Sequence, residues 1–235
     1  INMTGPTTIG NPAVSIPQSQ LLVSAGATFN DLGSVSHTVT GRGLITIAGD
    51  YIKSGAGTTV VQADWLNSGL TRVTGGTLQL LNGNVTNTGI FEANGGTLDV
   101  RGGTFFTNLN LATSTLTGGT YNVFANSTFQ ATNANIVTNA ATMLLDGANS
   151  NVLNASTLTS ALANFATNAT AGNFTIRNGR NLNTAGALAN AGQFTVGTGS
   201  TLTVSTALNN TGTFTLDGGA LSATTISNSG TLTGA

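Results

Sequence analysis

The sequence has no cysteine, only three prolines and very few charged residues. Without cysteine, neither a disulfide framework nor a thiolate metal site can form. Charged residues make up 6% of the chain, against about 25% in an ordinary soluble domain. Lys53 is the only lysine and the arginines stand singly, so no basic stripe is available for binding nucleic acid. We therefore expect no nucleic-acid partner.

Long hydrophobic runs are also missing. The longest, such as MLL at 143–145, are far shorter than the roughly 20 residues that cross a bilayer, so we expect no membrane insertion. Hydrophobic residues nevertheless make up 39% of the chain, and the net charge is −1. Disorder usually combines low hydrophobicity with high charge, so this composition predicts a folded protein.

A repeat of about 20 residues is the main feature that is present. ALANAGQF at 187–194 returns as ALNNTGTF at 207–214. In each copy an apolar residue stands two positions before an asparagine, and a glycine stands two positions after it. Phe or Leu follows four positions after the asparagine, with Thr71 as the exception. Five asparagines anchor the copies: Asn67, Asn87, Asn190, Asn210 and Asn228.

Apolar and polar residues alternate within each copy, as they do in strands with one buried face. So short a unit cannot cover its own apolar face, and successive units must stack. The repeat therefore predicts an all-β, single-domain parallel β-solenoid of about twelve coils of roughly 20 residues. We expect left-handed Asn and Gly corners, and the asparagines stacked in a hydrogen-bonded ladder. The predicted core contains Trp65, Phe91, Leu98, Phe194, Leu202, Leu208 and Phe214.

The repeat is looser between about residues 102 and 185. TAGNFTI at 170–176 restates the Phe strand and puts Thr170 in the place of the asparagine. Leu158, Leu162 and Phe165 have helical spacing, so a short helix is one reading of this region. Irregular coils are the reading that we favour.

The two ends of the sequence differ from the repeat. We expect residues 1–40 to form an extended leader and a cap, and residues 41–235 to form the solenoid. The sequence ends in the repeat segment SGTLTGA and has no charged residue after Asp217. We therefore expect open strand edges at this end, which associate with another coil. An extended arm at the other end could add a strand to a neighbour. The predicted self-assembly ends contain Pro6, Pro12, Pro17 and Leu232.

Residues 67–101 and 188–235 resemble the passenger repeats of bacterial autotransporters and of two-partner-secretion adhesins of the filamentous haemagglutinin type. The resemblance lies in N-x-G-x-[FL] followed by GGTL-like turns. It implies a right-handed parallel β-helix outside the cell or on the bacterial surface. It transfers no binding residue to this chain.

Residues with catalytic chemistry are few and scattered. Glycoside-cleaving enzymes need two carboxylates flanking one bond, and we expect Asp99 and Asp217 to be solvated surface residues instead. His37, the only histidine, is expected at the surface or at a sheet edge. Acidic residues do not recur at the turns as calcium-binding repeats require. We therefore predict no catalytic, cofactor-binding or metal-binding residues, and no enzyme activity.

Several functions remain open at this point. The first hypothesis is an extracellular structural or adhesive solenoid, either a head-to-tail filament or sheath subunit or the stalk of a longer adhesin. Its partners would be other copies of itself or ligands on a host or cell surface. A polysaccharide-acting β-helix enzyme and an ice-binding solenoid rank lower. The Thr-x-Thr pairs at 201, 213 and 231 suggest the latter, but we do not expect them to stay aligned from coil to coil.

Overall fold

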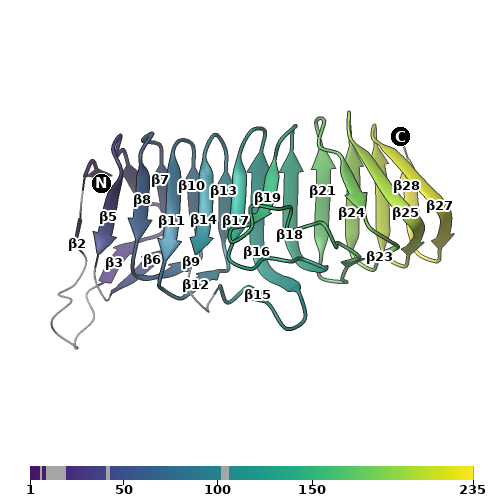
Figure 1. The fold of residues 1–235 in the computed structure, drawn as a ribbon, viewed down its shortest axis with the longest axis horizontal. Helices are drawn as coiled ribbons and strands as arrows, with labels where there is room; N and C mark the ends of the chain where they lie inside the picture. The colour runs from purple at the N-terminus through teal and green to yellow at the C-terminus, as the bar shows by residue number, and fades with distance from the viewer. Residues whose placement is uncertain (6, 9–19, 41–42, 102–105, 235) are drawn as a thin grey trace.

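The structure is a computed structural model that describes residues 1–5, 7–8, 20–40, 43–101 and 106–234. Short strands stack side by side into an elongated rod, with the N-terminal and C-terminal coils at opposite ends (Figure 1). The described residues contain strands and no helix. The predicted all-β parallel solenoid is thus confirmed, with about ten turns where the sequence predicted about twelve. The number is lower because the coils in the middle of the chain are longer than 20 residues.

The strands form three faces, which we call faces A, B and C. Face A contains β1 (Asn2–Met3), β4 (Thr28–Asp31), β7 (Asp50–Lys53), β10 (Leu70–Val73), β13 (Ile90–Ala93), β16 (Thr115–Phe124), β18 (Thr138–Asp146), β21 (Asn173–Arg177), β24 (Gln193–Gly197), β26 (Thr213–Asp217) and β28 (Thr231–Gly234). Face B contains β2 (Thr7–Thr8), β5 (His37–Thr40), β8 (Thr58–Val61), β11 (Thr77–Leu81), β14 (Thr97–Arg101), β17 (Thr128–Ala131) and β19 (Asn151–Asn154). Face C begins with β3 (Gln20–Val23), β6 (Leu44–Ile47), β9 (Asp64–Asn67) and β12 (Val85–Asn87).

The remaining strands complete the C-terminal coils and one insertion. They are β15 (Leu109–Asn110), β20 (Thr167–Asn168), β22 (Leu182–Thr184), β23 (Leu188–Asn190), β25 (Thr201–Asn210) and β27 (Ala220–Asn228). Strand β25 pairs with both β22 and β23, and then with β27, so these long strands extend over two faces of the coil. All strand pairs are parallel except that of β15 with β16, which forms a hairpin projecting from the rod (Figure 1).

The alternation of apolar and polar residues places one continuous core inside the rod. Parallel pairing aligns equivalent side chains, for example Leu78 with Leu98 and Phe194 with Phe214. In strands such as β11 and β18, the residues that alternate with these inward side chains point outward, which gives burial a period of two along the strand. The seven core positions expected from the sequence are at most 1% exposed: Trp65, Phe91, Leu98, Phe194, Leu202, Leu208 and Phe214.

The glycines of the N-x-G corners allow the coils to approach closely. A Cβ atom at Gly192 would lie 2.2 Å from the carbonyl oxygen of Gly172, and one at Gly212 would lie equally close to that of Gly192. The same distance recurs at Gly69, Gly89 and Gly230. None of these five glycines has a positive φ, and neither have the five anchor asparagines. The predicted left-handed corner is therefore wrong, and lack of space between coils explains the glycine.

The solenoid begins before residue 41. Strands β3, β4 and β5, all within residues 20–40, pair in parallel with β6, β7 and β8 of the next coil. Strands β1 and β2 pair in turn with β4 and β5. The predicted boundary between a leader and the solenoid is thus misplaced, because the early coils stack in the same way without the N-x-G motif. Pro6, Pro12 and Pro17 lie outside the described residues.

The middle of the chain contains irregular coils and no helix among its described residues, as expected. Leu162 and Phe165 are each 1% exposed and belong to the core. Leu158, which shares their helical spacing, is 63% exposed and has a φ of 56°. The apparent helical period therefore comes from two core residues of an irregular turn and one surface residue.

Candidate functional site

The anchor asparagines lie one above another along the rod. The Nδ2 of Asn190 donates to the Oδ1 of Asn210 at 2.7 Å, and the Nδ2 of Asn210 donates to the Oδ1 of Asn228 at the same distance. Asn67 and Asn87 make the equivalent contact, also at 2.7 Å. The structure thus brings together two groups of the predicted ladder residues, one in the N-terminal half and one at the C-terminal end. In both groups the donor belongs to the earlier coil.

Sequence reasoning missed other asparagines of this kind. Asn139 donates to Asn168 at 2.9 Å, and Asn168 donates to Asn190 at 2.8 Å, which extends the C-terminal ladder by two coils. Asn168 occupies the place that we predicted for Thr170. That prediction is wrong because this corner has two extra residues between the asparagine and Gly172. A search that allowed N-x-x-x-G corners would have found Asn168.

A column of aromatic rings runs beside the ladder in the C-terminal coils. The ring centroids of Phe174 and Phe194 lie 5.2 Å apart and those of Phe194 and Phe214 lie 5.3 Å apart, each pair with an interplanar angle of 6°. Offset stacking of this kind adds to the free energy of burying the rings. Identical residues in register therefore fill identical spaces in successive coils.

Thr71 interrupts this column in the N-terminal half, and Trp65 occupies the space. Thr71 aligns with Tyr51 on one side and with Phe91 on the other. The Trp65 Nε1 donates to the Thr71 hydroxyl at 3.3 Å, and the indole packs edge-on against Tyr51 with centroids 4.9 Å apart. Thr71 in turn donates to the Oδ1 of Asn67 at 3.0 Å. Thr71 is an exception to the repeat because the large side chain that fills this part of the core comes from Trp65 instead.

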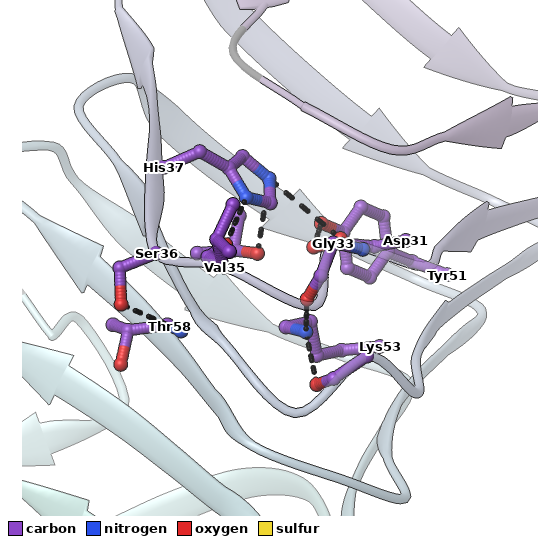
Figure 2. Close-up of polar contacts among 10 residues, drawn as sticks. Asp31, Gly33, Val35, Ser36, His37, Tyr51, Lys53 and Thr58 are labelled. Carbon is purple, nitrogen blue, oxygen red and sulfur yellow. Dashed lines mark hydrogen bonds and ion pairs between the residues drawn. The ribbon is translucent and has the colours of Figure 1, made fainter.

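The N-terminal coils enclose a second polar group, which we call the Asp31 cluster. Asp31, entirely buried, accepts the Tyr51 hydroxyl at 2.8 Å and the main-chain N–H of Gly33 at 3.2 Å. Lys53, also entirely buried, donates to the carbonyl oxygens of Gly33, at 3.2 Å, and Gly55. Figure 2 shows these side chains converging on the loop between β4 and β5. The cluster arises because alternation turns Tyr51 and Lys53 of β7 inward, where Lys53 aligns with Asp31 of β4 and Tyr51 aligns with Phe29.

His37 belongs to the Asp31 cluster and is not a surface residue. Its exposed fraction is 5%, and its Nε2 lies 3.7 Å from Asp31 Oδ1 and 3.2 Å from the Thr59 hydroxyl. Its Nδ1 lies 3.1 Å from the carbonyl oxygen of Val35. The expected surface position was wrong because β5 turns His37 inward, in line with Thr59 of β8.

Burial shifts the proton affinities of two members of the cluster. Desolvation is the main cause that raises the pKa of the Tyr51 hydroxyl well above its usual value, and the charge of Asp31 and its hydrogen bond add to it. Desolvation also lowers the pKa of Lys53, and the negative charge of Asp31 partly opposes this change.

Perturbed ionisable groups often mark active sites, but these are closed to solvent. Asp31, His37, Tyr51, Lys53 and Thr59 are each at most 5% exposed. Because a substrate cannot reach them, the chemistry that this arrangement performs is internal: it satisfies buried polar groups and joins two successive coils.

The carboxylates that the sequence placed at the surface differ in their environments. Asp217 is exposed, whereas Asp99 is only 2% exposed, so the prediction for Asp99 was wrong. Asp99 Oδ2 accepts from Arg101 Nε at 2.7 Å and from Gln79 Nε2 at 2.9 Å. Asp99 does point outward, but the long side chains of its neighbours cover it.

The outward threonines of the pairs at 213 and 231 are aligned, contrary to expectation. The pair at 201 is not kept from coil to coil, as expected, because Thr201 and Thr203 align with Ala220 and Ser222. Thr175, Thr195, Thr215 and Thr233 share one column in the register of β21, β24, β26 and β28. The neighbouring column contains Asn173 and Gln193 before it becomes threonine at 213 and 231. Alignment was missed because the motif was compared between strands of different faces.

The C-terminal coil exposes side chains at positions that other coils bury. Leu232 aligns with Phe214 and is 42% exposed, and Ile226 aligns with Leu208 and is 49% exposed. Phe214 and Leu208 are fully buried. This coil therefore presents the cross-section of the core, together with the open edges of β27 and β28.

Comparisons with protein-family models, with characterised proteins and with solved structures find no match for this chain. No group of three or more His, Asp or Glu side chains among the described residues is placed to hold a metal ion. None of the described segments is a helix of the length and apolarity needed to cross a membrane.

Proposed function

We propose that the protein is a structural or adhesive rod on the outside of a bacterial cell. The observation that carries this proposal is the parallel solenoid itself, in which coils with equivalent residues stack in register along the rod. Open parallel strand edges readily accept another strand. A second copy would make a filament or sheath, and additional coils of the same polypeptide would make the rod a stalk.

The proposed location rests on the passenger-like repeats, N-x-G-x-[FL] followed by GGTL-like turns. In the families that such repeats resemble, the solenoid lies outside the cell or on the bacterial surface. The corresponding partners here are other copies of the chain or ligands on a host or cell surface. The low charge of the rod suits contacts made by shape and hydrogen bonds better than long-range attraction.

Surface labelling of the source bacterium tests the proposal. Antibodies raised against the purified protein should label intact cells or material attached to them. Labelling that requires lysis of the cells would refute an external location. A cytosolic protein included in the same experiment provides the control for leakage.

Light scattering over a range of concentrations separates the filament from the stalk. If the chain forms fibres, Leu232→Lys should abolish them because it places a charge on the exposed core. Thr233→Lys is the matched control, since Thr233 points outward and contacts the Thr215 hydroxyl at 3.1 Å. Monomers at all concentrations would refute the filament and leave the stalk.

The aligned threonines favour ice binding as a second candidate. The column of Thr175, Thr195, Thr215 and Thr233 is uncharged and repeats at the inter-strand spacing of about 4.8 Å. β-Branched side chains in strands hold few rotamers, which keeps their hydroxyl groups ordered. Thermal hysteresis that is lost in Thr215→Lys would support this candidate, and its absence in the wild-type protein would reject it.

A further inference from the structure

A four-residue turn recurs where a strand of face A ends, and one copy of it carries an arginine. In each copy the last residue donates its main-chain N–H to the carbonyl oxygen three residues earlier, at 3.2 or 3.3 Å. The described turns of this kind end at positions 127, 150, 180 and 200. Ser127, Ser150 and Ser200 are at most 2% exposed, whereas Arg180 is half-buried. An arginine therefore takes a place that this corner otherwise gives to a small buried hydroxyl group.

The guanidinium group of Arg180 has no carboxylate partner. The other described arginines each donate from Nε to a carboxylate, at 2.6, 2.7 and 2.8 Å: Arg72 to Glu92, Arg101 to Asp99 and Arg177 to Asp146. The Nε of Arg180 is buried without a hydrogen-bond partner, and its Nη1 donates to the carbonyl oxygen of Asn181. The edge of the guanidinium that binds a carboxylate in the other arginines is thus unfilled here.

The acidic residues of this corner do not fill that edge. Asp146 already accepts Arg177 Nε at 2.8 Å and Asn178 Nδ2 at 2.7 Å. Asp217, which aligns with Gly197, forms no ion pair with a described residue. Burial lowers the pKa of the Arg180 guanidinium, although an arginine stays protonated in proteins. Because a charged donor without an acceptor is costly, we expect the acceptor to come from outside the chain.

A second unpaired donor lies beside Arg180 in the next coil. The register of β22 and β25 puts Ser200 at the position equivalent to Arg180, and neighbouring strands are about 4.8 Å apart. Ser200 is 2% exposed, and its Oγ has no hydrogen-bond partner. The equivalent hydroxyl of Ser150 donates to the carbonyl oxygen of Gly147 at 2.8 Å. Two buried polar groups without partners therefore occupy the same corner of successive coils.

We propose that the corner formed by Arg180 and Ser200 binds a carboxylate group of an acidic polysaccharide. The Nε and the adjacent Nη2 of Arg180 bind the two carboxylate oxygens side by side, and the Ser200 hydroxyl supplies a third hydrogen bond. A change of the Arg180 side-chain rotamer opens Nε to the ligand, since this residue is only half-buried. This inference deepens the proposed adhesive function and rests on it for the source of the ligand outside the cell.

The surroundings of Arg180 favour a polysaccharide over an acidic peptide. The exposed side chains next to it are the carboxamides of Asn178 and Asn181 and the hydroxyl of Thr198. A uronate residue carries one carboxylate among neutral hydroxyl groups, which matches one cation among neutral polar groups. An acidic peptide places several negative charges close together, and the two turns that end at 180 and 200 offer one unpaired cation.

Titration of the full chain with a short oligogalacturonate tests this proposal. Backbone amide chemical shifts locate the ligand and give its dissociation constant. Arg180→Lys keeps the charge and removes the planar fork, and Arg177→Lys makes the same change three residues away, where Asp146 still pairs with the charge. The methyl-esterified oligosaccharide and an oligoglutamate of the same length are the ligand controls. Trp65 fluorescence shows that each variant is folded.

Arg180→Lys should weaken binding about tenfold, Ser200→Ala about threefold and Arg177→Lys less than about twofold. The shifts should be confined to the two turns that end at 180 and 200. No binding by the wild-type protein, equal losses in the two lysine variants, or undiminished binding of the methyl ester would overturn the site. Tighter binding of the oligoglutamate would overturn the polysaccharide. Failure of surface labelling would refute the external location and leave this titration unaffected.

Discussion

The coils at the two ends of the rod fill the same cross-section with different chemistry. In the C-terminal coils, three stacked phenylalanines and a continuous asparagine ladder repeat with little variation. In the N-terminal coils, the ladder column is apolar and the interior holds the Asp31 cluster. The buried acidic and basic side chains among the described residues all lie in the first 100 residues: Asp31, His37, Lys53, Glu92 and Asp99.

This difference shows two ways of filling the interior of a solenoid and of pairing its buried polar groups. A column of identical residues needs one such residue in each coil, and it can continue through any number of coils. A cluster depends on particular partners from two neighbouring coils, so it fixes one set of neighbours and cannot be repeated in register. We infer that the Asp31 cluster gives the N-terminal coils a unique register, whereas the C-terminal coils are built for continuation.

The largest expected effect comes from a substitution in the stacked phenylalanines of the C-terminal coils. Phe194→Ala removes a ring that is stacked on both sides and should destabilise the protein by about 3–5 kcal/mol, because a cavity remains between rigid coils. Thr195→Ala, at the next and outward position, is the control and should cost less than about 0.5 kcal/mol. Chemical denaturation measures both. A small cost for Phe194 would mean that neighbouring coils collapse into the space.

Breaking the Asp31 cluster should be nearly as costly. Asp31→Ala leaves the Tyr51 hydroxyl and the Gly33 N–H without their acceptor and Lys53 without its nearby negative charge, which should cost about 3 kcal/mol. Asp50→Ala in the neighbouring β7, which points outward, is the control. The loss should be accompanied by faster hydrogen exchange in β4 and β5 and unchanged exchange in β24 and β26. Uniform loss along the rod would contradict an independent N-terminal register.

The two ends of the rod also differ in how well the sequence predicts their structure. The solenoid could be predicted because Asn190, Asn210 and Asn228 solve the same packing problem with the same residue. The register of the early coils could not be read in this way, since Val23 and Ile47 occupy the asparagine column. Thr71 looked like an exception because its compensation by Trp65 involves a residue six positions away.

The Asp31 cluster was missed because the sequence does not indicate whether the side chain of an isolated charged residue points into the core or outward. One signal was available: alternation puts Lys53 on the same side as the aromatic Tyr51, and a coil of 22 residues aligns Asp31 with Lys53. The inward position of His37 had no such aromatic neighbour to identify it. Asp99 was placed correctly as outward, but the sequence does not reveal how far Gln79 and Arg101 cover it.

Interrupting the asparagine ladder should have a moderate effect. Asn210→Ala leaves the Asn190 amide without its side-chain acceptor and should cost about 1–3 kcal/mol. Asn209→Ala is a matched control, because Asn209 is exposed in the same strand. Thermal melting of the two variants gives the comparison. Equal midpoints would show that the ladder is only a consequence of stacking and adds no stability.

The smallest expected effect is a pH dependence confined to the N-terminal cluster. Burial lowers the pKa of Lys53 from 10.5 in the unfolded chain, so between the lowered value and 10.5 the unfolded chain binds more protons than the folded one. Stability should therefore rise with pH across this interval and be least below it, where the buried ammonium is fully charged. The raised pKa of Tyr51 acts oppositely above about pH 10, but Lys53→Met retains Tyr51, so this contribution largely cancels between the two proteins. Unfolding free energies measured as the pH rises towards 10.5 should increase for the wild-type protein relative to Lys53→Met, and parallel curves would mean that Lys53 has the same pKa in the folded and unfolded chains.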